Sequence, residues 1–527
     1  MENCKKNKRK AKEKIIVEKV KKIFDKLIYV IEYIISLLLM INIFGIIADK
    51  AYNGYFPLNK IIPSAILAGA QVAIIIYICI KNKKVTEKLF VAFAIPLSIA
   101  FAIFILPLNV PDEGSHLLRA YDISVGNVFT QVDSEGNSQS ITIKELENYS
   151  YTRFQNYNDV RKELSKKTDY KTEVTVICAA QGSSPIIYIG TTAAILICRL
   201  FGANIFFAMY LGRLLNTIIF LVFGYFSIKK IPFGKVLLAL SLYMPMMLHQ
   251  AGSCSSDAVL NAVLIYYITF LIHLVFKKEK TTIGEKIQLF IYTALVAMFK
   301  YIYILVAGVL FITIFTKKEE RKEYLITILI MILVGSVFAI GWFVFTARYK
   351  TIPSEVIEYN KKVNVDSARQ IEFIKNNPSK AIKTFANEYI VYGHEYVTGA
   401  IGGILGWLEI DVNLGVIIAY LIILFIAAIS EKSEHEFSTK SKIWIFLLIF
   451  GISALLKGTM YIAFTPVGNG RICGVQGRYY TPLLFLAIMC LIKKNNNWEI
   501  KNLHEKMMVT STILNICAVI TVIQNYL

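Results

Sequence analysis

The chain has 527 residues, of which 56% are hydrophobic, and a formal net charge of +20 at pH 7. Its mean hydropathy is +0.54, and many runs of about 17 or more residues carry almost no charge, a pattern typical of membrane-spanning helices and not of a soluble multidomain enzyme. The basic residues gather in short loops between the apolar runs, as in cytoplasmic loops, so the net charge does not indicate nucleic-acid binding.

The first 26 residues hold eleven basic and four acidic residues, which we interpret as a basic cytoplasmic N-terminus. This segment is longer than the charged start of a signal peptide, and the apolar run behind it has no small-residue cleavage site. We therefore expect an uncleaved anchor, followed by two N-terminal transmembrane helices within residues 27–88, at about 27–48 and 62–80.

Residues 89–492 are predicted to form the main membrane domain. Its first helix, at about 89–107, leads to a polar external segment, 108–184, with eleven acidic and eight basic residues. Four apolar runs come next, at 185–201, 206–228, 234–252 and 258–276. If all four crossed the membrane, Lys277 and Lys278 would lie outside, against the positive-inside rule. We therefore expect 185–201 to lie along the outer face or to dip into it.

Two short apolar arms, at 287–299 and 301–316, flank Lys300. Each arm would be about 20–24 Å long as a helix, less than a ~30 Å bilayer core, so we predict a hairpin whose tip stops in the outer half. The remaining segments are a helix at 325–346, a second external loop at 347–411, and runs at 413–430, 442–464, 480–492 and 507–525. The sequence thus predicts an all-α polytopic membrane protein of about thirteen transmembrane helices with two long external loops. Residues 493–527 provide a cytoplasmic segment and the last helix.

The first external loop opens with PDEGSHLLRAY, residues 111–121. As a helix, this stretch places Asp112, His116 and Arg119 on one face, with Glu113 beside His116. Proline followed by acids is also ordinary helix-start chemistry, so a helix cap is the alternative interpretation of the two acids. A histidine and an arginine on the same stripe favour a functional site.

The predicted topology also brings Arg213 and Asp257 to the outer surface. Asp257 follows two serines ahead of an apolar run, which is equally typical of an N-cap. Lys300 lies inside an apolar hairpin, where a charge is costly and usually meets an anion or a wet cavity, with snorkelling to the interface as the alternative. Charges well inside the predicted spans are otherwise sparse, with Glu32 and Lys457 as further examples.

The last external loop, GNGRICGVQGRYYTP, carries Arg471, Arg478 and Tyr479 among four glycines. Glycines let backbone N–H groups turn toward an anion, and arginine offers a planar fork to phosphate oxygens, although contact with lipid headgroups would use the same residues. Trp407, in GGILGWLEIDV, fits either stacking on a sugar ring or a position at the membrane interface.

The eight cysteines show neither CxxC nor metal-ligand spacing. Most therefore look like packing residues, and the topology leaves one candidate disulfide, an external Cys254–Cys473 bridge. No Walker, Rossmann or EF-hand pattern occurs in the sequence.

Three blocks, PDEGSHLLRAY, GGILGWLE and GVQGRYYTP, resemble the signature patterns of a bacterial family of predicted polytopic membrane proteins, domain-of-unknown-function family twenty-one forty-two. The family patterns are PDE-x-x-H-x-x-R-A, G-x-L-G-W-L-D and QGRY-x-x-P, and the resemblance spans roughly residues 89–492. The family's architecture is similar to that of the GT-C glycosyltransferases, which use polyprenyl-phosphate sugars as donors. Glu409 stands where the second pattern has aspartate, which puts a catalytic role of this acid in doubt.

The resemblance implies that Asp112 or Glu113 matches the acidic motif of the first external loop in those enzymes, and that 185–201 matches an interfacial helix. We expect a multi-pass protein of the plasma membrane, with a cytoplasmic N-terminus, that moves a sugar from a polyprenyl-phosphate donor to an envelope glycan or lipid. Single displacement would invert the anomeric centre.

In this interpretation Asp112 and Glu113 are catalytic. The expected substrate-binding residues are His116, Arg119, Arg213, Asp257, Lys300, Trp407, Arg471, Arg478 and Tyr479. No cofactor is expected, and a divalent cation at the two acids is an open alternative. The alternative functions are a transporter or flippase of a lipid-linked or polymeric glycan, and a non-catalytic envelope-assembly protein. Polar groups gathered at the outer face favour surface chemistry over transport.

Overall fold

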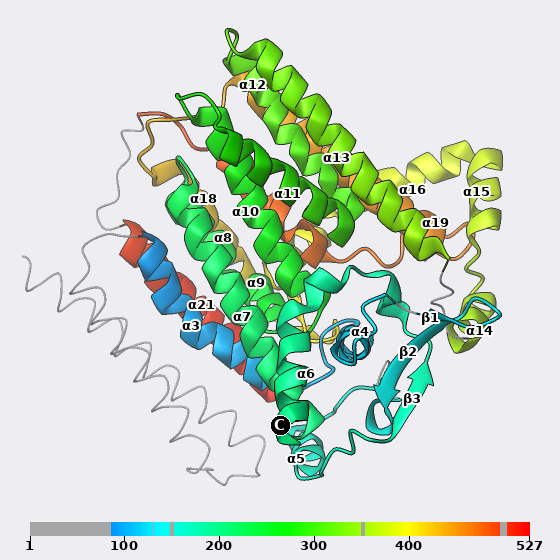
Figure 1. Ribbon diagram of the computed structural model, residues 1–527. Helices are drawn as coiled ribbons and strands as arrows, with labels where there is room; N and C mark the ends of the chain where they lie inside the picture. The colour runs from blue at the N-terminus through cyan, green and yellow to red at the C-terminus, as the bar shows by residue number, and fades with distance from the viewer. Residues whose placement is uncertain (1–85, 130, 148–151, 349–353, 496–502, 527) are drawn as a thin grey trace, which may run out of the picture. The chain divides into compact units, whose positions relative to one another are not determined.

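The computed structural model describes residues 86–129, 131–147, 152–348, 354–495 and 503–526 (Figure 1). These residues belong to one compact unit, Lys84–Leu527. The predicted basic N-terminus and the first two predicted transmembrane helices lie outside the described residues.

Helices make up most of the described chain, and six of them are long and apolar enough to cross a membrane. They are α3 (Thr86–Phe104), α7 (Ile205–Lys230), α10 (Ser256–Phe276), α13 (Arg321–Ala347), α19 (Thr439–Ala463) and α21 (Leu503–Tyr526). Each coincides with a run predicted from hydropathy, because an uncharged stretch of about 20 residues satisfies all its backbone hydrogen bonds as a helix in lipid.

The six long helices differ in what surrounds them. The apolar window of α10 is 89% buried, because α10 packs against α7, α9, α11 (Ile283–Phe299) and η4 (Tyr301–Phe311). The same window of α13 is only 17% buried, and its exposed side chains are mostly large and apolar. A helix that is apolar on all sides lies either in the protein core or in lipid, and α10 and α13 represent these two cases.

Several predicted crossings are shorter or interrupted. Run 234–252 is broken into α8 (Lys235–Leu242) and α9 (Pro245–Ala251), because Pro245 has no N–H to continue the helical ladder. Helices α18 (Leu414–Ser430) and α20 (Thr481–Met489) are also short. The second arm of the predicted Lys300 hairpin is the 3-10 segment η4 followed by α12 (Ile312–Thr316).

The segment predicted to lie at the outer face is the 3-10 turn η3 (Pro185–Tyr188) followed by α6 (Ile189–Phe201). Its 13 helical residues span roughly 20 Å, which is too short for a ~30 Å core. Gly202 ends the helix in the left-handed conformation, and α6 then packs along the first part of α7 (Figure 1).

The chain is mostly helical, as predicted, and the segment predicted as the first external loop, residues 108–184, adds three short strands. This segment contains α4 (Glu113–Ser124), the 3-10 turns η1 (Lys144–Leu146) and η2 (Ala179–Gly182), α5 (Tyr157–Leu164) and an antiparallel sheet of strands β1 (Gln131–Val132), β2 (Ser138–Ile143) and β3 (Glu173–Val176). The register pairs Ser140 with Val176. The buried carboxylate of Asp122 ties α4 to this sheet, because it accepts from the Ile141 backbone N–H at 2.9 Å.

The segment predicted as the second external loop, residues 347–411, contains four short helices and a hairpin. The helices are α14 (Ser354–Lys362), α15 (Ser367–Asn376), α16 (Pro378–Ile390) and α17 (Gly393–Ile401), and the hairpin strands are β4 (Ile404–Leu405) and β5 (Ile410–Asp411). The last external loop ends in the 3-10 turn η5 (Gly477–Tyr480), which packs on α17. Cys254 and Cys473 are both free thiols, so the predicted disulfide is wrong.

Candidate functional site

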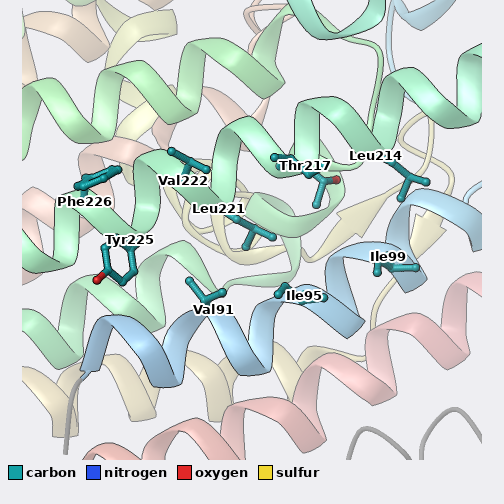
Figure 2. A pocket seen from close by; sticks show the side chains of 10 residues that line it. Val91, Ile95, Ile99, Leu214, Thr217, Leu221, Val222, Tyr225 and Phe226 are labelled. Atoms are coloured by element: carbon teal, nitrogen blue, oxygen red, sulfur yellow. The ribbon is translucent and has the colours of Figure 1, made fainter. Parts of the chain in front are cut away.

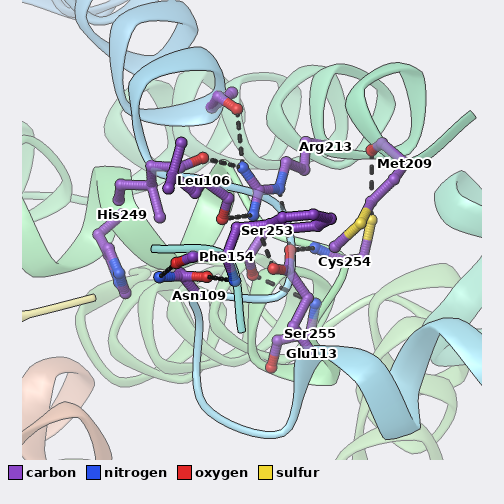
Figure 3. A network of polar contacts seen from close by, with 12 residues as sticks. Leu106, Asn109, Glu113, Phe154, Met209, Arg213, His249, Ser253, Cys254 and Ser255 are labelled. Atoms are coloured by element: carbon purple, nitrogen blue, oxygen red, sulfur yellow. Dashed lines mark hydrogen bonds and ion pairs between the residues drawn. The ribbon is translucent and has the colours of Figure 1, made fainter. Parts of the chain in front are cut away.

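Glu113 and Arg213 form a fully buried ion pair at the base of the first external segment (Figure 3). The guanidinium donates to both carboxylate oxygens, at 2.9 and 2.6 Å, and also to the carbonyl oxygens of Ala102, Ile105 and Leu106 at the end of α3. The last carbonyls of a helix have no partner within the helix, so Arg213 caps α3 while it neutralises Glu113. This pair therefore joins α3, α4 and α7.

The carboxylate of Glu113 has no oxygen left to face the outer surface. Its Oε1 atom also accepts from the Cys254 backbone N–H at 2.8 Å, and its side chain has no exposed area. The contacts of Glu113 and Arg213 are those of a structural ion pair, and their predicted catalytic and substrate-binding roles stay predictions. A divalent cation would find only Asp112 of the two acids, because both oxygens of Glu113 already accept hydrogen bonds.

Asp112 has a very different environment from its neighbour. Its backbone is left-handed, with φ 65° and ψ 5°, and its side chain makes no capping hydrogen bond to α4. The side chain is 61% exposed, and its Oδ2 atom lies 3.3 Å from Nη2 of Arg478. A left-handed non-glycine residue stores backbone strain that is often found at functional sites. The helix-cap interpretation of Asp112 is not supported, because the carboxylate caps nothing.

Arg478 contacts two aspartates that come from different parts of the chain, Asp112 and Asp257. It is 6% exposed, and its Nη1 atom lies 3.3 Å from Oδ2 of Asp257, while Nη2 faces Asp112. Asp257 lies in the first turn of α10, whose N-cap is Ser255. The contact with Asp257 is within ion-pair distance but is not aligned as a hydrogen bond, and within the described residues Nη1 and Nε of Arg478 have no hydrogen-bond acceptor. The guanidinium therefore retains donors for a further anion.

His116 lies one helical turn after Asp112. Its Nδ1 atom is 2.6 Å from the Tyr188 hydroxyl, and Nε2 is 3.4 Å from the Ser256 hydroxyl. Burial is the largest influence on its pKa and lowers it, and the positive charge of Arg478 acts in the same direction, whereas Asp112 and Asp257 oppose it. The net effect is a lowered pKa, so His116 is neutral at pH 7.

Lys300 and Tyr479 complete the cluster around Arg478. Lys300 lies at the break between α11 and η4, and its ammonium is 3.9 Å from the centroid of the Tyr479 ring. The Tyr303 hydroxyl donates to the Tyr479 carbonyl oxygen at 2.7 Å, which fixes the backbone next to Arg478. Six predicted site residues therefore gather here: Asp112, His116, Asp257, Lys300, Arg478 and Tyr479. We refer to these six residues as the outer polar cluster.

Three predicted residues lie elsewhere. Arg119 is 2% exposed and pairs with Asp122 at 2.9 Å, so it stabilises the external sheet region. Arg471 pairs with Glu395 at an exposed position. Trp407 has the guanidinium of Arg153 over its ring, at 5.4 Å from the centroid. That face of the indole is therefore occupied by Arg153.

Gly477, which precedes Arg478, serves close packing between backbones. A Cβ atom at Gly477 would lie 2.5 Å from the Cα of Gly399 in α17 and 2.7 Å from the Ala400 nitrogen. The glycines of this loop were predicted to turn backbone N–H groups toward an anion, whereas the contact of Gly477 with Gly399 was not predicted. The contacts of His116 with Tyr188 and Ser256 were not predicted either. Ser256 stands next to Asp257 in the sequence, whereas nothing local marks Tyr188.

An apolar groove of about 550 Å³ runs between α3 and α7 (Figure 2). Val91, Ile95 and Ile99 line it from α3, and Leu214, Leu221 and Phe226 are among the residues that line it from α7. Leu214, the first lining residue along α7, directly follows Arg213 in the chain.

Comparison with known proteins gives one family match. No curated protein and no solved structure is significantly similar to the chain. The model of a family described as "Predicted membrane protein (DUF2142)" matches residues 95–487, which is well over half of the chain. The match contains all three signature blocks and every residue of the outer polar cluster. The chain is therefore a membrane protein of the DUF2142 family.

Proposed function

We propose that this protein is an integral-membrane glycosyltransferase that moves a sugar from a polyprenyl-phosphate donor to a cell-envelope glycan or lipid at the outer face of the plasma membrane. The observation that carries the proposal is the contact between Asp112, exposed and left-handed, and Arg478, buried. The Asp112 carboxylate, which caps no helix, lies beside the Arg478 guanidinium, whose remaining hydrogen-bond donors can bind a phosphate.

In this proposal the acceptor hydroxyl oxygen attacks the anomeric carbon while the bond from that carbon to the phosphate oxygen breaks. Asp112 takes the hydroxyl proton, and the electron pair of the broken bond stays on the lipid phosphate. A positioned general base contributes about 10²–10⁴-fold to such a step. One displacement without a covalent intermediate inverts the anomeric centre.

The leaving phosphate needs positive charge where its own charge develops. Arg478 supplies hydrogen-bond donors in a fixed plane, because Asp257 lies against one of its terminal nitrogens. Lys300, next to Tyr479, adds a second cation. Donors held in place before the reaction stabilise developing charge without reorganising, and losing one such donor typically costs about 10²–10³-fold in turnover.

Two further features support this assignment. His116 is neutral, so its ring nitrogens suit hydrogen bonding to sugar hydroxyls without adding charge to the site. The apolar groove between α3 and α7 could receive part of a hydrocarbon tail, because its lining is almost entirely apolar. A similarity to GT-C glycosyltransferases, implied by the family resemblance, points to the same chemistry.

The test is release of polyprenyl phosphate by the purified protein, reconstituted with a labelled polyprenyl-phosphate sugar and a mixture of envelope glycans. Asp112→Asn keeps the shape of the side chain and removes its charge, so turnover should fall by about 10²-fold or more. The matched control is Glu372→Gln, an exposed acid on α15 in the other external loop, which should leave turnover unchanged. Normal turnover by Asp112→Asn would exclude this base.

Transport of a lipid-linked glycan is the second candidate function. Helices α8 and α9 are separated by a break at Tyr243–Met244, and α11 and η4 by a break at Lys300. Broken helices of this kind form substrate sites in many transporters. A transporter would move the intact labelled donor across a vesicle membrane without releasing polyprenyl phosphate, so the same reconstituted vesicles distinguish the two functions.

A further inference from the structure

Lys457 is a buried lysine in α19 whose ammonium is surrounded by tyrosines. It is 2% exposed, and its Nζ atom lies 4.2 Å from the ring centroids of both Tyr389 and Tyr396 and 5.0 Å from that of Tyr480. It also donates to the hydroxyls of Tyr480, at 3.0 Å, and Ser453, at 3.3 Å. Aromatic faces attract a desolvated cation, so these rings replace the water that the ammonium has lost.

The rings of Tyr389, Tyr396 and Tyr480 form what we call the Lys457 cage. The carboxylate whose charge acts on the lysine, Glu388, is hydrogen-bonded to other groups. Glu388 is fully buried, and it accepts from the Tyr396 hydroxyl and, at 2.8 Å, from the Ile472 backbone N–H. Within the described residues Lys457 forms no ion pair with a carboxylate. The charge therefore holds aromatic rings together instead of neutralising an acid.

The three rings come from three separate external elements. Tyr389 belongs to α16, Tyr396 to α17 and Tyr480 to η5, whereas Lys457 belongs to the long helix α19. The rings of Tyr396 and Tyr480 also contact each other, with centroids 5.4 Å apart. Lys457 thus contacts α16, α17 and η5 at once, and Ser453 of α19 supports it with hydrogen bonds to the hydroxyls of Tyr389 and Tyr480.

Tyr480 transmits this constraint to Arg478. Both residues belong to the single 3-10 turn η5, in which Gly477 packs on Gly399 and the Tyr479 carbonyl accepts from Tyr303. Tyr480 is the last residue of the turn, and two side chains of α19 hold its hydroxyl, the ammonium of Lys457 at 3.0 Å and the hydroxyl of Ser453 at 3.3 Å. Lys457 therefore helps to fix the end of the turn that follows Arg478.

We infer that Lys457 is a positioning residue that acts through Tyr480 to hold the guanidinium of Arg478 in the outer polar cluster. This inference rests on the proposed function, in which Arg478 stabilises the leaving phosphate. Lys457 itself does not touch the substrate. Replacing Lys457 should therefore lower turnover only by disturbing the position of Arg478.

The activity test uses Lys457→Met and Tyr480→Phe in the full-length protein, with Lys440→Met as the control at the exposed opposite end of α19. Each of the first two variants should lose about 10-fold in turnover per folded molecule, and the double variant should lose no more than either alone. In an Arg478→Lys background, Lys457→Met should cost less than about 2-fold. Independent, multiplying losses would overturn the inference, because non-additivity is what residues acting as one unit show.

A second measurement does not depend on catalysis. Deuterium uptake by the backbone of residues 474–482 should rise in Lys457→Met and Tyr480→Phe and stay unchanged in Lys440→Met, in lipid nanodiscs. If the wild-type protein releases no polyprenyl phosphate but the uptake rises, the proposed function fails and the positioning role stands. If the uptake is unchanged while the wild-type protein is active, the positioning role fails by itself.

Discussion

Gly477 and Gly399 bring η5 and α17 together backbone to backbone, with no side chain between them. A Cβ atom at Gly477 would lie 2.5 Å from the Cα of Gly399, closer than non-bonded atoms approach. The glycine before Arg478 is therefore required by packing, and the position of the arginine depends on it.

Gly477→Ala should destabilise the protein, because neither backbone can move without shifting η5 or α17. Overpacking of this kind typically costs about 1–3 kcal/mol in the free energy of unfolding. The measurement is thermal unfolding in detergent. Gly470→Ala in the same loop is the control, since a Cβ there meets nothing within 4 Å, and equal effects of the two changes would contradict the packing role.

The long helices were predictable because hydropathy depends on local composition. All six candidate spans of the described residues were visible as apolar runs. Counting charges predicted one side of the membrane for the two acids and the arginine of the outer polar cluster. The contact of Asp112 with Arg478 joins two loops separated by most of the chain. The sequence predicted that they share a side of the membrane, and the structure supplies the distance.

The partners of individual charges were less predictable, because they depend on which helices pack together. Nothing local indicates that Arg213 binds Glu113 and caps α3. The i,i+3 spacing of Arg119 and Asp122 is a local signal of their ion pair, which the predicted stripe with His116 overlooked. Pro245 is different, since a proline inside an apolar run is a readable signal of the break between α8 and α9. The prediction of an unbroken crossing at 234–252 overlooked it.

Glu113→Gln should destabilise the protein strongly, since it leaves the guanidinium of Arg213 buried without its carboxylate. Breaking a buried ion pair from one side costs about 3–5 kcal/mol. The free energy of unfolding in a mild detergent measures it, and Asp112→Asn should change that energy little because its side chain is 61% exposed. A similar stability for both variants would show that the Glu113–Arg213 pair does not hold the fold.

His116 should make stability depend on pH in a defined direction. Its pKa in the folded protein lies below the ordinary histidine value of 6.5, so between the two values the unfolded chain binds a proton that the folded chain does not. The contribution of His116 to the free energy of unfolding is therefore fully present above pH 6.5 and is lost as the pH falls below that value. Unfolding of the wild-type protein and of His116→Gln, compared between pH 7.5 and 5.5, should show a shallower pH dependence in the variant. Parallel curves would mean that His116 titrates normally.

Arg478 provides the sharpest test of the proposed phosphate site. Its guanidinium faces Asp112 and Asp257 through two different nitrogens, a geometry that a single ammonium cannot reproduce. Arg478→Lys should therefore lose turnover nearly as severely as Arg478→Ala, by about 10²-fold or more if the arginine acts as other transition-state donors do.

Arg471 in the same loop is the matched control, because it pairs with Glu395 at an exposed position and should tolerate both changes. The measurement is release of polyprenyl phosphate by all four variants in the same lipid. If lysine at position 478 retained most of the activity, the fixed plane of donors would not be needed, and the partner of the leaving phosphate would have to be sought at Lys300.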